Sequence, residues 1–219
     1  MFSNFDFDVL INNAPFLWNG MLLTLELTAL AVSGGLALGL LLAIARLSPI
    51  RPLAWFVAGY VNFLRSMPLI LVIFWFYTLV PKIIGRPVSG FYSVLIAFVM
   101  FEAAYYSEII RAVISSVRRD QIAAAMALGL TGFQAMRYVV LPQAVRNMIP
   151  VLLTQSIVML QDTSLVYIVG LRDFLSSADI VASRDNRPTE LYLFVAIVFL
   201  VICFSASRLV NRLRRRYAL

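Results

Sequence analysis

Residues 18–45 read WNGMLLTLELTALAVSGGLALGLLLAIA, a run that contains a single charged side chain, Glu26. An α-helix rises 1.5 Å per residue, so this run would be about 42 Å long and would exceed the roughly 30 Å of hydrocarbon in a bilayer. It therefore predicts a membrane-spanning helix. Gly35 and Gly39 lie four residues apart within it, a spacing that lets a neighbouring helix approach closely. We interpret this pair as ordinary packing within a helix bundle rather than as a dedicated dimer seam.

Further apolar runs, bounded by charges or by proline and glycine, follow at about 67–85, 91–111, 149–170 and 190–208. The 219 residues are 62% hydrophobic and 13% charged, with a mean hydropathy of +0.89, which is typical of a membrane protein and leaves no room for a soluble catalytic domain. We expect an all-α membrane protein that forms one transmembrane domain over residues 1–219, with five transmembrane helices. There is no histidine and one cysteine, Cys203, so we expect no metal site and no bound cofactor.

The positive charges indicate how the spans are oriented. If the N-terminus lies outside, 13 of the 18 Lys and Arg residues fall in inner connections and in the C-terminal tail. Because basic residues accumulate on the cytoplasmic side of membrane proteins, we expect the N-terminus outside and the C-terminus in the cytoplasm. The net charge of +7 is then mainly a topology signal, and we expect no nucleic acid partner. Residues 1–20 lack a basic start, so we expect no cleaved signal peptide.

Two inner segments are too interrupted to span the membrane. Residues 46–66 carry Trp55, Phe56, Tyr60 and Phe63, and we expect a helix at the cytoplasmic interface, where aromatic side chains are favoured. The other segment, about 118–142, has the pattern of two short helices joined by a glycine turn.

Capping chemistry defines those two helices. Asp120 is suited to an N-cap, and Gly129 is suited to the left-handed position that ends a helix. Thr131 and Gln134 have the spacing of a capping box for a second helix, which runs toward Leu141 before Pro142 begins the next segment. The apolar face of this pair can pack under its own bundle or can insert into a groove on a cytosolic partner; composition alone does not decide between them.

The segment resembles the EAA loop of ABC importer permeases. That pattern is E-A-A-x-x-x-G, nine residues, then I-x-L-P, and here residues 123–129 read AAAMALG and residues 139–142 read VVLP. Ala123 replaces the glutamate of the pattern and Val139 replaces the isoleucine. If position 123 is the third residue after an Asp120 cap, the change removes roughly 0.3 to 1 kcal/mol of capping and helix-dipole stabilisation and leaves the docking surface. The resemblance implies ATPase docking by Ala124, Ala125, Ala127, Leu128, Gly129, Phe133, Leu141 and Pro142.

Other stretches narrow the resemblance to the polar amino acid uptake family of type I ABC importers. They are YVNFLRSMPL at 60–69, YYSEIIR at 105–111, LPQAVR at 141–146 and QDTSL at 161–165. The runs FEAAYYSEIIRA at 101–112 and QDTSLVY at 161–167 are similar in particular to glutamate/aspartate permeases. The resemblance implies a multi-pass permease of the bacterial inner membrane. Its implied partners are a second homologous or identical permease, two cytosolic ATPase subunits, an extracytoplasmic amino-acid-binding protein and membrane lipid. The chain has no G-x-x-x-x-G-K-[ST] motif, so we expect ATP and Mg²⁺ to be used by the partner ATPase.

Acidic side chains within spans are costly and indicate functional positions. Asp162 falls near the middle of the fourth span, so we expect a substrate path along Gln161, Asp162, Thr163 and Ser164, together with Glu102. A local structural role for Asp162 stays open. Glu108 and Arg111 are three residues apart and should form a structural ion pair. The source of a cation for an acidic substrate stays open among Arg111, the partner permease and backbone dipoles.

Three alternatives remain at this level. The same machinery could carry a neutral or basic polar amino acid such as glutamine, arginine or histidine. A secondary transporter or channel is expected to have more than five spans or an internal inverted repeat, and the sequence shows neither. An intramembrane enzyme using Glu102, Glu108 or Asp162 as an acid or base lacks a nucleophile beside a base, so we expect a transport subunit and no enzyme.

Overall fold

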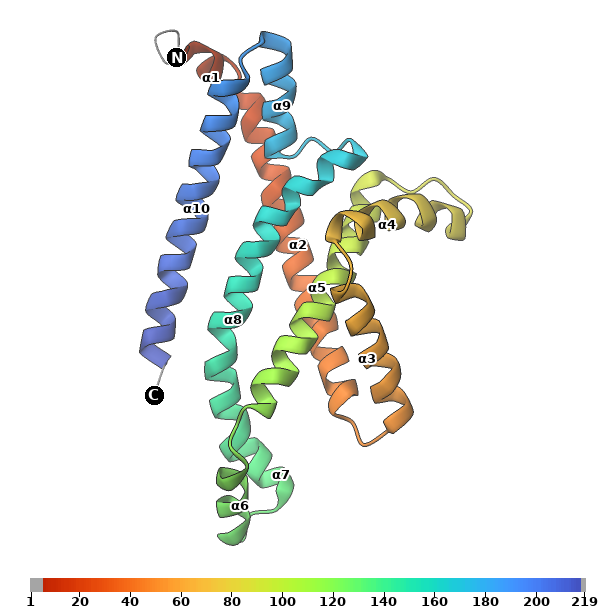
Figure 1. Ribbon diagram of the computed structural model, residues 1–219, viewed down its shortest axis with the longest axis vertical. Coiled ribbons are helices and arrows are strands. Elements are labelled where there is room, and N and C mark those ends of the chain that lie inside the picture. The colour runs from red at the N-terminus through yellow and green to blue at the C-terminus, as the bar shows by residue number, and fades with distance from the viewer. Residues whose placement is uncertain (1–5, 218–219) are drawn as a thin grey trace.

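The computed structural model describes residues 6–217, and within that range the chain is helical without strands. Four long helices form the frame in Figure 1: α2 (Ala14–Leu47), α5 (Gly90–Ser115), α8 (Leu141–Asp162) and α10 (Pro188–Tyr217). The connecting elements are α1 (Asp8–Asn12), α3 (Arg51–Arg65), α4 (Leu69–Ile84), α6 (Arg119–Ala127), α7 (Gly132–Ala135), the π-helix η1 (Met136–Val140), the 3₁₀-helix η2 (Thr163–Val169) and α9 (Phe174–Asp185).

The seam between α2 and α5 is built on glycine. A Cβ atom placed on Gly35 would lie 2.7 Å from the Cβ of Glu102, and one placed on Gly39 would lie 2.8 Å from the Cβ of Tyr106. Side chains at these positions are therefore excluded, because real Cβ atoms do not approach that closely. The predicted role of the Gly35 and Gly39 pair, packing within the bundle, is confirmed, and its neighbour is α5 of the same chain.

The other end of α2 is held against α9. A Cβ on Gly20 would lie 2.7 Å from the carbonyl oxygen of Asp173. The buried Thr24 hydroxyl accepts a 3.1 Å hydrogen bond from the backbone N–H of Phe174, at the first turn of α9. The Asp173 carboxylate caps the same turn by accepting from the N–H groups of Leu175 and Ser176. α9 is therefore fixed to α2 before the chain enters α10.

Helices α3 and α4 form a bent pair, with an angle of 108° between them at a short break. α3 buries Val57, Val61 and Leu64 in the core that α2 and α5 share, while Trp55 and Phe56 remain exposed. The helix expected at 46–66 is thus packed along the bundle on one side. α4 has 16 residues, about 24 Å of helix, which is shorter than the roughly 30 Å hydrocarbon core.

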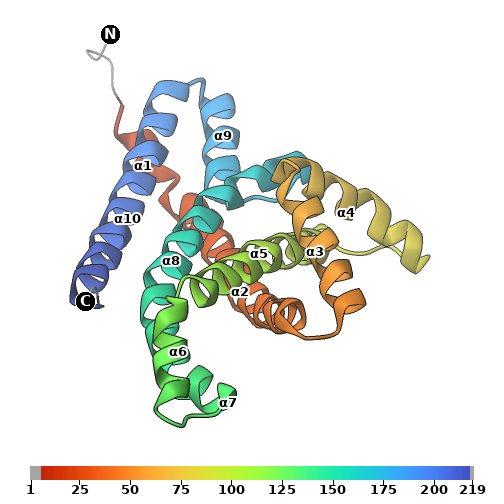
Figure 2. The ribbon, with the colours of Figure 1, turned by 60° about the horizontal axis from the view of Figure 1, so that its bottom comes forward.

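Within residues 6–217, four helical segments are long and apolar enough to cross a membrane, and the count becomes five if α3 and α4 form one bent span. The segment expected at 149–170 belongs to a longer helical stretch, Gly132–Val169, which includes α7, η1, α8 and η2. Figures 1 and 2 show that the α6–α7 hairpin lies at one end of the molecule, beyond the ends of α5 and α8. The hairpin is therefore outside the layer in which the long helices pack together.

Candidate functional site

The turn between α6 and α7 has the geometry that its sequence predicts. Gly129 adopts a left-handed backbone with φ of +88°. Its N–H donates to the carbonyl of Met126, and the N–H of Leu130 donates to the carbonyl of Ala125. These two bonds form a Schellman motif, which satisfies carbonyl groups that the helix end leaves free. The prediction that Gly129 ends the first helix is confirmed.

The predicted capping box is also present. The backbone N–H of Gln134 donates to the Thr131 hydroxyl at 3.3 Å, and the Gln134 side chain accepts from the backbone N–H of Thr131 at 2.8 Å. Two N–H groups that the helix start would leave free are thereby satisfied. The hairpin conformation is therefore set by hydrogen bonds within residues 125–134.

The start of the first helix differs from the prediction that Asp120 is its N-cap. The N-cap residue is Arg118, and Asp120 lies inside the first turn. The Asp120 carboxylate instead accepts hydrogen bonds from the Arg118 guanidinium at 2.6 and 3.1 Å. Ala123 consequently is not the third residue after the cap, so the argument that its identity costs a capping-box contribution is wrong.

The second helix of the hairpin is shorter than expected and does not stop before Pro142. α7 is one turn long and passes through η1 directly into α8. Pro142 cannot donate a backbone hydrogen bond, and the helix widens to the π form immediately before it. The Gln143 side chain donates to the carbonyl of Val139 at 3.0 Å within this wider turn. The hairpin is thus continuous with a long helix that runs through the molecule.

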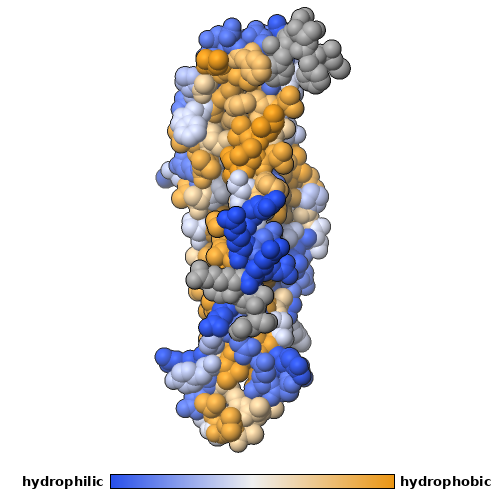
Figure 3. Space-filling model, turned by 90° about the vertical axis from the view of Figure 1, so that its left-hand side faces the viewer, coloured by the Kyte–Doolittle hydropathy of each residue, from blue (hydrophilic) through white to orange (hydrophobic). Residues whose placement is uncertain are grey.

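Most of the expected docking residues lie on the surface of the hairpin. Leu128 is 85% exposed and Phe133 is 75% exposed. The side chains of Ala124, Ala127, Leu141 and Pro142 and the backbone of Gly129 are also exposed. Figure 3 shows hydrophobic surface at the lower tip of the molecule, flanked by hydrophilic surface.

Two corrections apply to this surface. Ala125 is 5% exposed, so its side chain packs inside the hairpin and does not present itself to a partner. Met126 and Tyr138, which the motif does not include, are 53% and 62% exposed. Their exposure could not be deduced from the motif, since it depends on how α6 folds back on η1.

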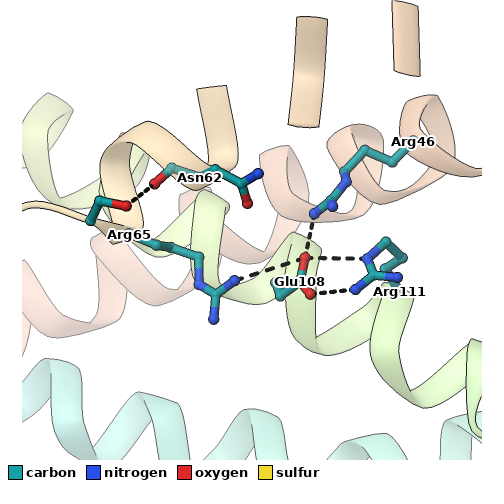
Figure 4. Close-up of polar contacts among 6 residues, drawn as sticks. Arg46, Asn62, Arg65, Glu108 and Arg111 are labelled. Carbon is teal, nitrogen blue, oxygen red and sulfur yellow. Dashed lines mark hydrogen bonds and ion pairs between the residues drawn. The ribbon is translucent and has the colours of Figure 1, made fainter. Parts of the chain in front are cut away.

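A second polar cluster forms where α2, α3 and α5 meet. The predicted pair of Glu108 with Arg111 is present, and Arg111 donates to both carboxylate oxygens. Arg46 on α2 also donates to this carboxylate, and Arg65 on α3 lies 3.9 Å from it while stacking on Tyr105. Figure 4 shows the three guanidinium groups converging on Glu108. The cluster ties three helices together and occupies Arg111, so Arg111 is a poor source of a free cation for substrate.

The residues expected along the substrate path are only partly brought together. Glu102 is fully buried and accepts a 3.0 Å hydrogen bond from the Gln155 amide on α8. Its second carboxylate oxygen has no hydrogen-bond partner among the described residues. Asp162 is half-buried and is the last residue of α8. Gln155 was not anticipated, because its contact with Glu102 spans 53 residues of sequence.

The hydroxyl groups beside Asp162 are used within the chain. Thr163 is fully buried, and its hydroxyl donates to the carbonyl of Leu160 at 2.6 Å. The Ser164 hydroxyl donates to the carbonyl of Gln161 at 2.8 Å. Thr163 therefore stabilises the change from α-helix to 3₁₀-helix and is not accessible to a substrate, while the Gln161 side chain is exposed.

Comparisons with known proteins agree along nearly the whole chain. Residues 35–219 match the family described as binding-protein-dependent transport system inner membrane component. The chain is 47% identical to the glutamate/aspartate import permease protein GltK of Escherichia coli O6:H1 (strain CFT073), over 98% of this chain and 99% of that protein. It is 34% identical to the probable glutamine ABC transporter permease protein GlnM of Bacillus subtilis (strain 168), over 95% and 96% of the two chains.

A solved structure supports the same assignment. The crystal structure of an amino acid ABC transporter with histidines matches with a TM-score of 0.91 at 34% identity, covering 96% of this chain and 98% of that chain. The expected type I importer permease fold is thereby confirmed. The chain belongs to the family of binding-protein-dependent transport system inner membrane components, and it is an inner-membrane protein.

Proposed function

We propose that this chain is the permease subunit of an ATP-binding-cassette importer for amino acids, with glutamate and aspartate as its substrates. The substrate assignment is supported by the 47% identity to a glutamate/aspartate permease over almost the full length of both proteins. Relatives named for glutamine and arginine are less similar, at 34% and 30% identity. A shared substrate class is therefore better supported with the glutamate/aspartate permease than with the relatives named for glutamine and arginine.

The proposed topology has five crossings, with the N-terminus outside and the C-terminus in the cytoplasm. The α3–α4 pair is the second crossing in this arrangement. It puts the α6–α7 hairpin and the arginine-rich end of α10 on the cytoplasmic side, in agreement with the distribution of basic residues. The hairpin is then available to a cytosolic protein.

The observation that carries the proposal is the continuity of the hairpin with α8. Exposed apolar side chains on the hairpin, led by Leu128 and Phe133, are suited to a groove on an ATPase subunit. We propose two such ATPase subunits, which hold the ATP and Mg²⁺, and a second homologous or identical permease subunit. A displacement of the hairpin would move α8, because η1 joins the two elements without a loop.

The proposed substrate path lies along the parts of α8 that this displacement would move. The half-buried Asp162 carboxylate provides an acceptor for the α-ammonium group of an amino acid delivered by an extracytoplasmic binding protein, and the fully buried Glu102 acts on the path through its hydrogen bond with the half-buried Gln155. Gln161 and Ser164 are accessible beside Asp162. Because both carboxylates carry the wrong charge for the carboxylates of glutamate, this part of the path recognises the ammonium end alone.

The test is reconstitution of the complete complex, with its binding protein and ATPase, in proteoliposomes. We expect ATP-dependent uptake of glutamate and aspartate, and calorimetry should show that the binding protein prefers them to arginine, histidine and glutamine. The reverse preference would contradict the substrate assignment. Uptake by the permease alone, without any ATPase, would contradict the importer mechanism.

A further inference from the structure

A groove between α5, α8 and α10 has the size and the chemistry of a ligand site. Its volume is about 510 Å³, within the roughly 300 to 1,000 Å³ that small-molecule sites occupy. It opens near the arginine-rich end of α10, where Figure 3 shows a hydrophilic patch below an apolar band. The polar lining side chains are Arg146, Asn147, Thr154, Gln155, Asn211 and Arg214.

The polar residues that line the groove on α8 belong to a longer series of polar residues along that helix. Asn147, Thr154 and Gln161 are spaced by seven residues, as are Gln155 and Asp162, so these side chains follow one face of the helix. Gln155 lines the groove and also donates to Glu102. The distance along α8 from Gln155 to Arg146 is about 14 Å, so Arg146 lies at the inner end of this polar series, and Arg214 on α10 lines the same groove.

The two groove arginines differ from the arginines around Glu108. Arg46, Arg65 and Arg111 share one carboxylate. Neither Arg146 nor Arg214 is part of an ion pair among the residues that the structure describes, and the groove lining contains no acidic side chain there. A guanidinium group can hold a carboxylate with two parallel N–H donors. The groove is therefore an unneutralised anion site at the end of a path whose middle is acidic.

We propose that Arg146 and Arg214 form the carboxylate-binding site of the inner half of the transport path, where they hold the carboxylates of the substrate. This inference rests on the proposed function as an amino acid importer. An acidic amino acid carries two carboxylates and one ammonium group, and it passes from the ammonium-binding region at Asp162 and Glu102 toward two cations. The arginines lower the free energy of the substrate on the cytoplasmic side, where release must occur.

The test compares two double variants that remove the same charge from the end of the molecule. R146Q/R214Q neutralises the groove, while R212Q/R215Q neutralises two arginines that line a neighbouring hollow and not the groove. In the reconstituted complex, we expect R146Q/R214Q to lower the initial rate of glutamate uptake by about tenfold, because charge-assisted hydrogen bonds are lost. R212Q/R215Q should stay within about twofold of wild type, and R146K/R214K should recover part of the rate because the charge remains.

The outcomes separate this inference from the function on which it rests. If R146Q/R214Q took up glutamate at the wild-type rate, the groove site alone would be overturned. If the wild-type complex took up arginine and not glutamate, the substrate assignment and the groove site would both be overturned. A lipid headgroup has the same anionic chemistry, so the assay is repeated in vesicles of zwitterionic phosphatidylcholine only. A defect that appears only when anionic lipid is present would assign the groove to lipid and overturn the proposal.

Discussion

The α6–α7 hairpin and the α2–α5 seam both depend on glycine, for different physical reasons. Gly129 in the hairpin has a left-handed backbone, and a Cβ atom there would meet nothing within 4 Å. Gly39 in the seam has an ordinary helical backbone, but a Cβ atom there would lie 2.8 Å from Tyr106 and 3.0 Å from the carbonyl oxygen of Ala103. The hairpin needs the backbone freedom of glycine, and the seam needs its lack of a side chain.

This difference separates the part of the chain that we propose to transmit motion from the part that holds the helix bundle together. The seam is in the middle of the bundle, with Leu27, Ala31 and Phe98 fully buried beside it. The hairpin holds its shape through its own hydrogen bonds and leaves Leu128 and Phe133 exposed. Variants in the seam should therefore damage the fold, whereas variants in the hairpin should damage coupling and leave the fold intact.

The largest effect is expected from Gly39→Leu. A leucine cannot enter the seam without separating α2 from α5, and overpacking of a well-packed core typically costs about 1 to 3 kcal/mol, with larger values where backbone must move. Because Gly39 faces the Ala103 carbonyl as well as Tyr106, we expect a cost at the upper end of that range. The measurement is the thermal unfolding midpoint of the purified complex, together with the yield of folded protein after size exclusion.

The matched control is Gly59→Leu on α3. A Cβ atom at Gly59 meets nothing within 4 Å, so a leucine there should leave the unfolding midpoint close to that of wild type. Equal destabilisation by both variants would show that the close approach of α2 and α5 is not what holds the bundle together.

A selective loss of coupling is expected from Gly129→Asp. A side chain at a φ of +88° is strained by roughly 1 to 2 kcal/mol, and the carboxylate adds a charge to the apolar tip. We expect ATP-dependent uptake to be abolished while membrane insertion and the unfolding midpoint stay near wild type. Uptake and stability are measured on the same preparation.

Gly132→Ala provides the comparison for that variant. Gly132 is also in open space, and it has no positive φ. Alanine there should leave uptake within about twofold of wild type, since alanine has the higher helix propensity. Normal uptake by Gly129→Asp would remove the hairpin from the coupling mechanism.

The same contrast explains which features could be predicted from the sequence. The turn at Gly129 and the capping box of Thr131 and Gln134 depend on neighbours within a few residues, and both predictions were confirmed. Asp120 was assigned wrongly as a cap because aspartate suits two local roles, and its pairing with Arg118 decides between them. Capping patterns therefore predicted the position of the turn correctly, but they did not predict the residue at which the first helix begins.

Most contacts between distant segments could not be predicted from the sequence. Glu108 and Arg111 were paired from their spacing on one helix, but Arg46 reaches the same carboxylate from 62 residues away. Gly35 and Gly39 indicated a close helix neighbour without identifying α5. The substrate path shows the same limit, since Thr163 was predicted from its position beside Asp162 and its burial depends on the packing of η2.

The smallest effect is expected from two polar positions of the hairpin, in Thr131→Ala at its turn and Asp120→Ala in its first helix. Thr131 caps α7, and loss of such a cap costs typically about 1 kcal/mol, whereas an exposed pair like Arg118 with Asp120 contributes about 0 to 1 kcal/mol with a median near the low end. Hydrogen exchange of the amides in residues 126–134 should accelerate about fivefold in Thr131→Ala and less than twofold in Asp120→Ala. If Asp120→Ala had the larger effect, Asp120 would be acting as the cap, and the hairpin would be held from its first helix rather than from its turn. The order of the two variants therefore tests whether the proposed coupling element is stabilised at its turn, from which α7 and η1 lead into α8, or at its first helix.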